Sequence, residues 1–285
     1  MQLLSWNIQW ACGCDGRVSL PRIADEIRQM GDFDVICLQE VAVNHPRLAG
    51  SAGEDQVALL GDAFPGYSLH YGIGSDLAGD GGSRRLFGNL VLSRLPVGQV
   101  LRHSLPQPAE PGCPSMPRAA LEVIVAAGRG ALRVTTTHLE YYSLAQRTAQ
   151  IRHLRALHEE AYSHSVNAVV GDDLDPPFDL PRRPVSSIYC GDFNCPPEAA
   201  ELGCLQQPFE KGAPGLRDAW SVAHPGIPNA FTVGLNGCAW PDRPYCCDYF
   251  FVSENLCSSV RGVSVNQETN ASDHQPIFLE LAPED

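Results

Sequence analysis

The sequence predicts a domain that combines strands with helices, and three observations support this fold class. Short apolar runs such as Leu3 to Ile8 and Asp34 to Leu38 end in polar residues, which is typical of core strands. Other stretches repeat apolar residues at helical spacing. The chain has 285 residues and 44% hydrophobic content, so it can bury a large core. Because no internal repeat or low-complexity linker divides it, we expect residues 1–285 to form one domain.

Three stretches are predicted to be helices. Ser19 precedes Pro21, the pattern of an N-cap residue followed by proline in the first turn. Ile23 and Ile27 then fall on one face of the same helix. The other two helices are expected over residues 57–64 and 144–161.

The remaining segments are predicted to be strands and loops. Residues 74–88 carry five glycines among polar residues, which indicates a mobile loop. Residues 171–184 are rich in aspartate and proline and are expected to form an acidic loop that borders the functional site. Two pairs of adjacent strands are expected, one over residues 90–92 and 97–101 and the other over residues 119–126 and 132–137.

Four polar clusters follow strand-like runs. Carboxylates, carboxamides and a histidine at several strand ends are what metal-assisted phosphoester hydrolysis requires. One group must hold a divalent metal, another must activate water, and others must hold the phosphoryl oxygens. The clusters are Ser5-Trp6-Asn7, Leu38-Gln39-Glu40, Cys190-Gly191-Asp192-Phe193-Asn194 and Ala271-Ser272-Asp273-His274-Gln275-Pro276.

The order and spacing of these motifs resemble the endonuclease/exonuclease/phosphatase superfamily, which includes DNase I, the apurinic endonucleases, neutral sphingomyelinases and inositol polyphosphate 5-phosphatases. The resemblance covers Leu3 to Leu281 and implies a DNase I-like fold. That fold is an α+β, four-layer α/β sandwich of two packed, mostly antiparallel β-sheets flanked by helices, with the active site at one edge. The matching motifs are Trp6-Asn7, Gln39-Glu40, Thr137-His138-Leu139, Gly191-Asp192-Phe193-Asn194, Asp248-Tyr249-Phe250-Phe251-Val252 and Ser272-Asp273-His274-Gln275-Pro276.

The resemblance implies a site for Mg²⁺ (or Mn²⁺). Glu40 is expected to bind the metal after its apolar strand, since Mg²⁺ prefers few carboxylates and several waters. Asn7 is expected to contact the metal or a phosphoryl oxygen, and Asp273 is expected to lie on the side of the site that binds the metal. Asp192 is expected to orient or deprotonate the attacking water, or to bind a second metal. Asp192 and Asn194 lie two residues apart on a segment predicted to be extended, so both should project to the same side.

The resemblance also implies the groups that handle protons and phosphate. Asp248 and His274 are expected to form a hydrogen-bonded dyad, in which the carboxylate fixes the imidazole and favours its charged form. His138 matches the DNase I, sphingomyelinase and inositol phosphatase branches, whereas the apurinic endonucleases usually have asparagine there. No clear match exists for the carboxylate that supports this histidine, and the loop around Asp80 is its expected place. The predicted catalytic residues are His138, Asp192, Asn194, Asp248 and His274; the predicted phosphate-binding residues are Asn7, Arg118, His138 and Asn194.

Charge narrows the substrate class. The formal net charge is −13, Lys211 is the single lysine, and the closest basic pairs are Arg84-Arg85 and Arg182-Arg183. Duplex DNA affinity depends on many basic residues, so this composition favours small or lipid-like phosphoesters. A nuclease acting on single-stranded or modified ends is the alternative. A non-catalytic binding module is a further alternative, opposed by the presence of Asp192, Asp273 and His274.

Cysteine usage and the N-terminal sequence indicate the compartment. The eleven cysteines include no Cys-x-x-Cys pair, which favours reduced, buried thiols over a zinc site or a disulfide framework. No charged segment followed by a long apolar run opens the chain, and no run of 18 apolar residues occurs. We therefore expect a cytoplasmic protein without a transmembrane segment, whose partner is a small-molecule or nucleic-acid phosphoester and which has no obligate protein partner.

Overall fold

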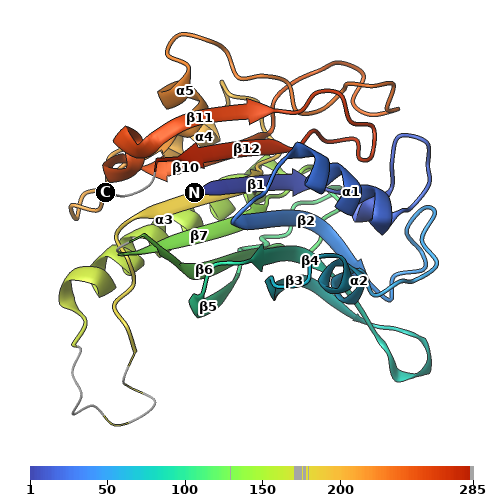
Figure 1. Cartoon of the computed structure of the whole chain (residues 1–285), viewed down its shortest axis with the longest axis horizontal. Helices are drawn as coiled ribbons and strands as arrows, with labels where there is room; N and C mark the ends of the chain where they lie inside the picture. The colour runs from blue at the N-terminus through green and yellow to red at the C-terminus, as the bar shows by residue number, and fades with distance from the viewer. Residues whose placement is uncertain (129, 170–174, 176–177, 179, 283–285) are drawn as a thin grey trace.

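Two six-stranded β-sheets pack face to face in the computed structural model, which describes all residues except 129, 170–174, 176–177, 179 and 283–285 (Figure 1). The first sheet has the order β11-β12-β1-β2-β4-β3, and the second has the order β5-β6-β7-β8-β10-β9. The strands are β1 (Gln2–Asn7), β2 (Val35–Val43), β3 (Ser68–Ala78), β4 (Arg84–Ser93), β5 (Val97–Ser104), β6 (Ala119–Ala127), β7 (Gly130–His138), β8 (Ser187–Asp192), β9 (Leu216–Asp218), β10 (Asp248–Ser253), β11 (Val260–Val265) and β12 (Ile277–Leu281).

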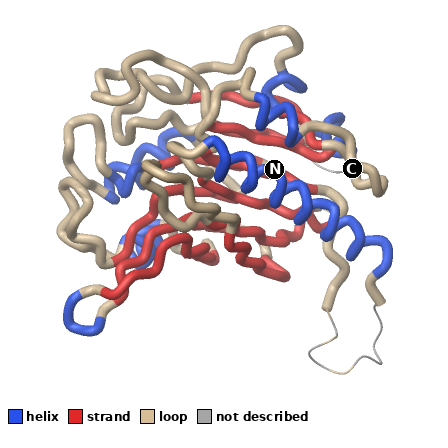
Figure 2. Tube along the Cα trace, turned by 180° about the vertical axis from the view of Figure 1, so that it is seen from behind, coloured by secondary structure: helices blue, strands red, loops and turns tan. Residues whose placement is uncertain are grey.

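Helices cover both outer faces of the sandwich, which confirms the predicted four layers. α1 (Leu20–Met30) and α2 (Gln56–Ala63) lie on the first sheet, and the long α3 (Leu144–Asn167) crosses the second sheet beside α4 (Ala200–Leu205) (Figures 1 and 2). The short α5 (Ala219–Ala223) packs against β10 and β11. The predicted cap of α1 is also confirmed, because the Ser19 side chain accepts a hydrogen bond from the Arg22 amide at 3.3 Å.

Strand alternation builds two separate apolar layers from adjacent residues. Leu3 points between the sheets, where it packs in one cluster with Ile188 of β8. Leu4, the next residue, points outward and packs with Ile23 and Ile27 of α1. The sheets are therefore buried on both faces, and most of the polar sequence motifs lie at or beyond strand ends.

The strand pairings bring those ends to one edge. β1 and β2 are parallel, as are β7 and β8, while the other pairs in each sheet are antiparallel, which confirms mostly antiparallel sheets. In register, Asp192 at the end of β8 lies between His138 on β7 and Asp248 on β10. Asn7 at the end of β1 pairs with Gln39 of β2. The sequence motifs thus meet because neighbouring strands end together.

Two local predictions were wrong. Residues 74–88 are mostly the β3–β4 hairpin rather than a loop. The glycines serve close contact between strands, because a Cβ added to Gly88 would lie 2.2 Å from the Gly72 carbonyl oxygen. The strand pair expected around Arg94-Leu95-Pro96 does not form either. β4 and β5 belong to different sheets, so this connection crosses the sandwich.

Three further expectations concern the cysteines, the acidic segment and membranes. Cys14 and Cys238 form a disulfide, which corrects the expectation that all cysteines are reduced, while the other nine are free and mostly buried. Most of the aspartates of the acidic segment, namely Asp172, Asp173 and Asp179, lie outside the described residues. No helix in the described part of the chain has the length and apolar character needed to cross a membrane.

Candidate active site

The Asp192 carboxylate is the centre of the polar groups at this edge. Its Oδ2 accepts a hydrogen bond from Asn7 Nδ2 at 3.1 Å. The same oxygen lies 3.3 Å from His138 Nε2 and 3.6 Å from His274 Nε2. Asn7 Nδ2 also donates to Glu40 Oε1 at 3.1 Å. Groups from both sheets therefore converge on one oxygen that is almost completely buried.

Asp248 and His274 form a buried pair beside this centre. His274 Nδ1 lies 2.9 Å from Asp248 Oδ2, and the Thr232 hydroxyl donates to the same oxygen at 2.6 Å. Burial opposes charge on the imidazole, but Asp248 and Asp192 together raise the pKa of His274 well above its ordinary value. The Trp6 indole donates to the His274 carbonyl at 2.9 Å and holds this segment in place. The pair is thus an imidazolium fixed by a carboxylate.

His138 has the opposite electrostatic character. Burial, with Arg118 and His274 nearby, lowers the pKa of His138 well below its ordinary value, so the ring is neutral. The carboxylates near it are Glu40, 3.7 Å from Nδ1, and Asp192, 3.3 Å from Nε2. The expected partner region was wrong, because Asp80 lies in the exposed turn of the β3–β4 hairpin.

Glu40 occupies a bulge within a strand rather than the end of one. β2 continues to Val43, and its register with β4 shifts between Leu38 and Val41. Glu40 has φ 60°, a left-handed conformation that is costly for a residue with a side chain. This bulge turns Glu40 toward Asn7 and His138. Burial, reinforced by Asp273, raises the pKa of Glu40 to about 7.

Asp273 lies on the same side as Glu40 and is held by Gln9. The Gln9 side chain donates to Asp273 Oδ2 at 2.7 Å. Burial raises the pKa of Asp273, partly offset by His274. Asn7 contributes differently, because its Oδ1 accepts the Gln9 amide at 3.0 Å while its Nδ2 faces the carboxylates. Asn7 therefore offers N–H groups to this centre.

Asn194 does not continue the strand as predicted. β8 ends at Asp192, and Asn194 has φ 52° in the left-handed region that asparagine tolerates. Its amide donates to Asp192 Oδ1 at 2.8 Å, so the two residues form an Asx-type turn. Its side chain donates to the Leu139 carbonyl at 2.9 Å. The turn fixes the second oxygen of Asp192 and orders the segment next to it.

Arg118 is a buried cation with free hydrogen-bonding capacity. Its exposed fraction is 9%, and its Nε lies 3.7 Å from Glu140 Oε2 without a hydrogen bond. Its Nε and Nη1 have no partner among the described residues. Burial lowers the pKa of Arg118, although Glu140 and Glu40 act against this shift. Arg118 lines a small cavity together with His138 and Glu40, which places its positive charge beside these two residues.

The donor set fits a hard divalent cation. Four carboxyl groups, Glu40, Asp192, Asp248 and Asp273, gather around the imidazolium of His274 and the guanidinium of Arg118. Burial raises the pKa of Asp192 to about 6, an effect that His274 partly offsets. The carboxyl groups outnumber these cations, and carboxyl oxygens are the ligands that Mg²⁺ and Mn²⁺ prefer. Glu40 and Asp273 are less buried than Asp192, which leaves room for the waters that Mg²⁺ retains.

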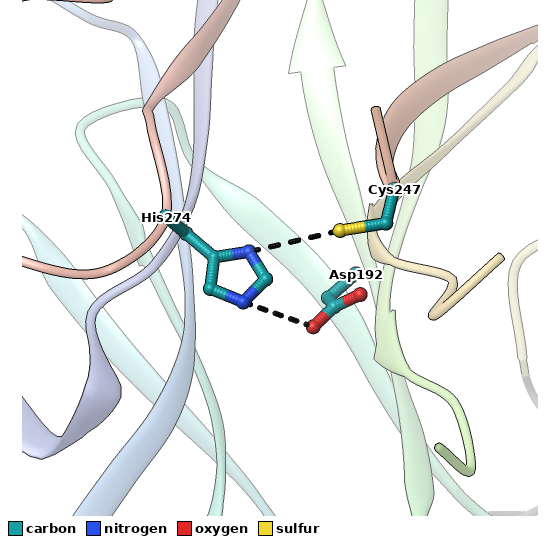
Figure 3. Close-up of side chains that lie close together, drawn as sticks. All are labelled: Asp192, Cys247 and His274. Carbon is teal, nitrogen blue, oxygen red and sulfur yellow. Dashed lines mark hydrogen bonds and ion pairs between the residues drawn. The ribbon is translucent and has the colours of Figure 1, made fainter. Parts of the chain in front are cut away.

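A cysteine also lies close to this centre, but it does not complete a metal site. Asp192, Cys247 and His274 have ligand atoms within 4.8 Å of one another (Figure 3). Cys247 Sγ faces His274 Nδ1, which contacts Asp248, whereas Asp192 faces His274 Nε2. Since the two ring nitrogens point in different directions, one ion cannot bind all three groups. Burial also raises the pKa of the Cys247 thiol, so the thiol stays protonated.

Sequence reasoning missed three residues that support the site. Thr232 holds Asp248, Gln9 holds Asp273, and the Trp240 ring lies 6.0 Å from the His274 ring. Thr232 and Trp240 come from an irregular segment with no strand or helix pattern. Only Gln9 could have been predicted from the sequence, because it follows the Trp6-Asn7 motif.

Two packed mixed sheets with a polar centre at one edge define the DNase I-like fold class. A sequence model of the Endonuclease/Exonuclease/phosphatase family matches residues 4–274. The chain belongs to this family, and a search of curated proteins finds no match.

Solved structures show the same fold over nearly the whole chain. An endonuclease/exonuclease/phosphatase from Beutenbergia cavernae has 25% identity and a TM-score of 0.65, covering 99% of this chain and 72% of that one. Truncated TDP2 from Caenorhabditis elegans has 18% identity and a TM-score of 0.66, covering 99% and 96%. A mannosyl-6-phosphatase from Bacteroides thetaiotaomicron has 16% identity and a TM-score of 0.66, covering 99% of each chain.

Proposed function

We propose that this protein is a metal-dependent phosphoester hydrolase in which an activated water attacks phosphorus in line with the leaving oxygen. The observation that carries the proposal is the convergence of Asn7, His138 and His274 on Asp192 Oδ2, at 3.1, 3.3 and 3.6 Å. A carboxylate held by donors from both sheets is positioned to accept a proton from water. The family to which the chain belongs comprises enzymes that cleave phosphoesters.

The charge of each residue indicates its role in the proposed reaction. Asp192 accepts the proton of the attacking water, while Asn7 and the Asx turn at Asn194 fix its orientation. The His274 imidazolium, held by Asp248 at 2.9 Å, stabilises negative charge on a phosphoryl oxygen. Arg118, which lines a small cavity with His138 and Glu40, holds the non-reacting oxygens.

Glu40 and Asp273 would hold Mg²⁺ or Mn²⁺, and Gln9 keeps Asp273 in position. When bound, the metal neutralises charge on the leaving oxygen. The left-handed conformation of Glu40 supports this assignment, because a strained residue in a bulge persists only where the surrounding structure fixes it.

Charge placement supports a small phosphoester over duplex DNA. The basic pairs are engaged within the protein: Arg84 lies 2.7 Å from Asp76, and Arg183 is buried 3.0 Å from Glu122. The net charge of −13 further opposes binding to a row of phosphates. The substrate is therefore recognised mainly at one phosphoryl group.

A substrate screen tests the proposal. Phosphomonoesters, phosphodiesters and labelled oligonucleotides are incubated with Mg²⁺, with Mn²⁺ or with EDTA, and the His274→Ala variant controls for contaminating activity. We expect metal-dependent release of phosphate or alcohol by the native protein alone. Hydrolysis that persists equally in EDTA, or in His274→Ala, would contradict the proposal.

Salt dependence tests the substrate class. Duplex and single-stranded oligonucleotides are titrated at several salt concentrations with Ca²⁺ to limit cleavage. We expect weak duplex binding whose logarithm falls only shallowly with log salt. A submicromolar affinity with a slope implying about six or more phosphate contacts would replace the small-substrate proposal with a nuclease.

A further inference from the structure

A large groove opens beside the proposed catalytic centre. Its volume is about 880 Å³, within the range of small-molecule sites. Asn194, which forms the turn with Asp192, lines its wall, and so does Cys246, two residues before Asp248. The groove thus borders the turn that fixes Asp192 and the segment that leads to Asp248.

The walls of this groove are aromatic and proline-rich. Tyr141, Phe231, Trp240 and Tyr245 line it together with five prolines. The Trp240 ring lies 5.6 Å from that of Tyr141 and 6.3 Å from that of Tyr245, both in edge-to-face arrangements. Trp240 also lies 6.0 Å from His274. The aromatic cluster therefore connects the groove to the Asp248–His274 pair.

The segment that carries these rings is tied to the rest of the site. The Thr232 amide donates to the Tyr245 carbonyl at 2.9 Å, and the Thr232 hydroxyl holds Asp248. The Cys14–Cys238 disulfide attaches the chain two residues before Trp240. On the opposite wall, Arg147 donates to the Tyr141 carbonyl at 3.0 Å. The rings are therefore held in place, which reduces the entropy lost when a ligand binds.

The chemistry of the walls selects the occupant. Prolines have no backbone N–H, and the charged groups in the lining are Glu198, Asp242 and Arg243. Two carboxylates against one guanidinium repel further phosphates, so the occupant of the groove carries no second phosphate there. Aromatic faces and proline rings instead suit a flat, uncharged ring, which stacks or packs edge to face.

We propose that the groove is a subsite for a planar aromatic group attached to the scissile phosphoester, such as a nucleobase or an aryl ring, with Trp240 as its main contact. This inference rests on the proposed function, because the phosphoryl group at Asp192 and His274 aligns the rest of the substrate with the groove. Base–aromatic stacking changes affinity by roughly 5- to 150-fold per ring.

Matched substrates isolate the ring. Adenosine 5′-monophosphate and ribose 5-phosphate share the same ester and differ in the base. Benzyl and cyclohexylmethyl phosphate differ in ring planarity at similar size. Each is also tested as its methyl diester. We expect kcat/KM to be at least about 10-fold higher for the base-bearing or benzyl member, mainly through KM. A preference for both planar members indicates any flat ring, and a preference for the nucleotide alone indicates a nucleobase. Equal values in both pairs would overturn the proposal.

Variants assign the effect to the groove. Trp240→Ala should lower kcat/KM about 10-fold for adenosine 5′-monophosphate and less than about 2-fold for ribose 5-phosphate, whereas Trp240→Phe should restore most of the loss. Tyr142→Ala is the control, because its ring is 63% exposed and does not line the groove. An equal loss for both substrates in Trp240→Ala would show a general structural effect and contradict the assignment.

A binding measurement separates this inference from the proposed function. Calorimetry in EDTA compares adenosine 5′-monophosphate with ribose 5-phosphate on the native protein and on Trp240→Ala. If no phosphoester is hydrolysed but the nucleotide binds about 10-fold tighter in a Trp240-dependent manner, the groove stands and the hydrolase proposal fails. If hydrolysis occurs and adenosine 5′-monophosphate binds no more tightly than ribose 5-phosphate, the hydrolase stands and the groove proposal fails.

Discussion

Two buried polar clusters at opposite ends of the strand β7 show how differently the same kinds of residue can be arranged. Arg133, near the start of β7, belongs to an arginine cluster with Glu122, His158 and Arg183. His138, at the end of β7, belongs to the candidate active site. Both clusters combine carboxylates, histidine and arginine, and most of their side chains are buried.

In the arginine cluster each carboxylate oxygen has its own donor. Glu122 Oε2 accepts Arg133 at 3.2 Å, and Oε1 accepts Arg183 at 3.0 Å. His158 is neutral and its Nε2 lies 2.9 Å from the Pro214 carbonyl, to which it donates. With Glu160, which pairs with Arg183 at 2.8 Å, two carboxylates match the two arginines without an added ligand, and the cluster has a structural role.

At the candidate site the balance is incomplete. Asn7, His138 and His274 surround a single oxygen of Asp192, while Arg118 keeps two unpartnered nitrogens in the described structure. Carboxyl groups also outnumber the cations around them. The difference teaches that the buried polar cluster whose charges do not balance is the one arranged for a ligand. Four predictions test this comparison.

The largest effect is expected at His274. His274→Ala should lower turnover at least about 10³-fold, because it removes the cation facing the phosphoryl group. Asp248→Asn should lose less, since Asp248 acts through His274. Steady-state kinetics of the single and double variants measure this. A double variant much worse than His274→Ala would show that the two residues do not act as a unit.

In the arginine cluster the effect should fall on stability instead. Glu122→Gln should lower the free energy of unfolding by about 3 kcal/mol, because two buried guanidinium groups lose their counterion. Turnover per folded molecule should stay within about 2-fold. Urea unfolding and activity assays measure the two quantities.

Glu160→Gln is the matched control for that experiment. Glu160 also pairs with Arg183, at 2.8 Å, but its side chain is 59% exposed. Its loss should cost less than about 1 kcal/mol. Equal destabilisation by the two variants would show that burial does not distinguish these pairs.

Glu40→Gln should lower activity at the candidate site without lowering the stability of the protein. We expect turnover to fall about 10²-fold at limiting Mg²⁺, because the metal loses a carboxylate. The unfolding free energy in EDTA should not decrease, since the substitution removes one of several crowded carboxyl groups. Near-normal activity at limiting Mg²⁺ would show that Glu40 does not hold the metal.

The effect expected at His158 is confined to acid pH, where stability depends on the protonation of this residue. Burial, with Arg133 nearby, lowers the pKa of His158 to about 4, whereas the same side chain has a pKa near 6.5 in the unfolded protein. The unfolded state therefore binds more protons between these values, so stability is complete above about pH 6.5 and falls as pH drops toward 4. This group accounts for on the order of 3 kcal/mol of that loss.

His158→Gln should remove that component. Urea unfolding at pH 7 and at pH 4.5 compares the variant with the native protein, and the variant should lose less stability between the two pH values. An identical loss in both proteins would show that His158 is protonated at the same pH in the folded and unfolded states.

The sequence predicted most elements because their signals are local. The serine cap of α1, the facing pair β6 and β7, and the apolar face of α3 each depend on residues close in the chain. The β3–β4 hairpin was missed because its glycines resemble those of a loop. Only the packing shows that Gly88 must approach Gly72, a contact between strands.

The sequence by itself determined which family the chain belongs to and which residues are candidates for its chemistry, since motif order and spacing suffice for both. Tertiary structure alone decided where these candidates meet. Asn7 meets Asp192 across 185 residues of sequence, and the aromatic groove assembles from segments on both sides of the site. The tertiary structure also decided the protonation of the two histidines. His138 is neutral and His274 is charged, because the burial and the neighbouring charges differ at each ring. Both causes depend on distances in the folded chain.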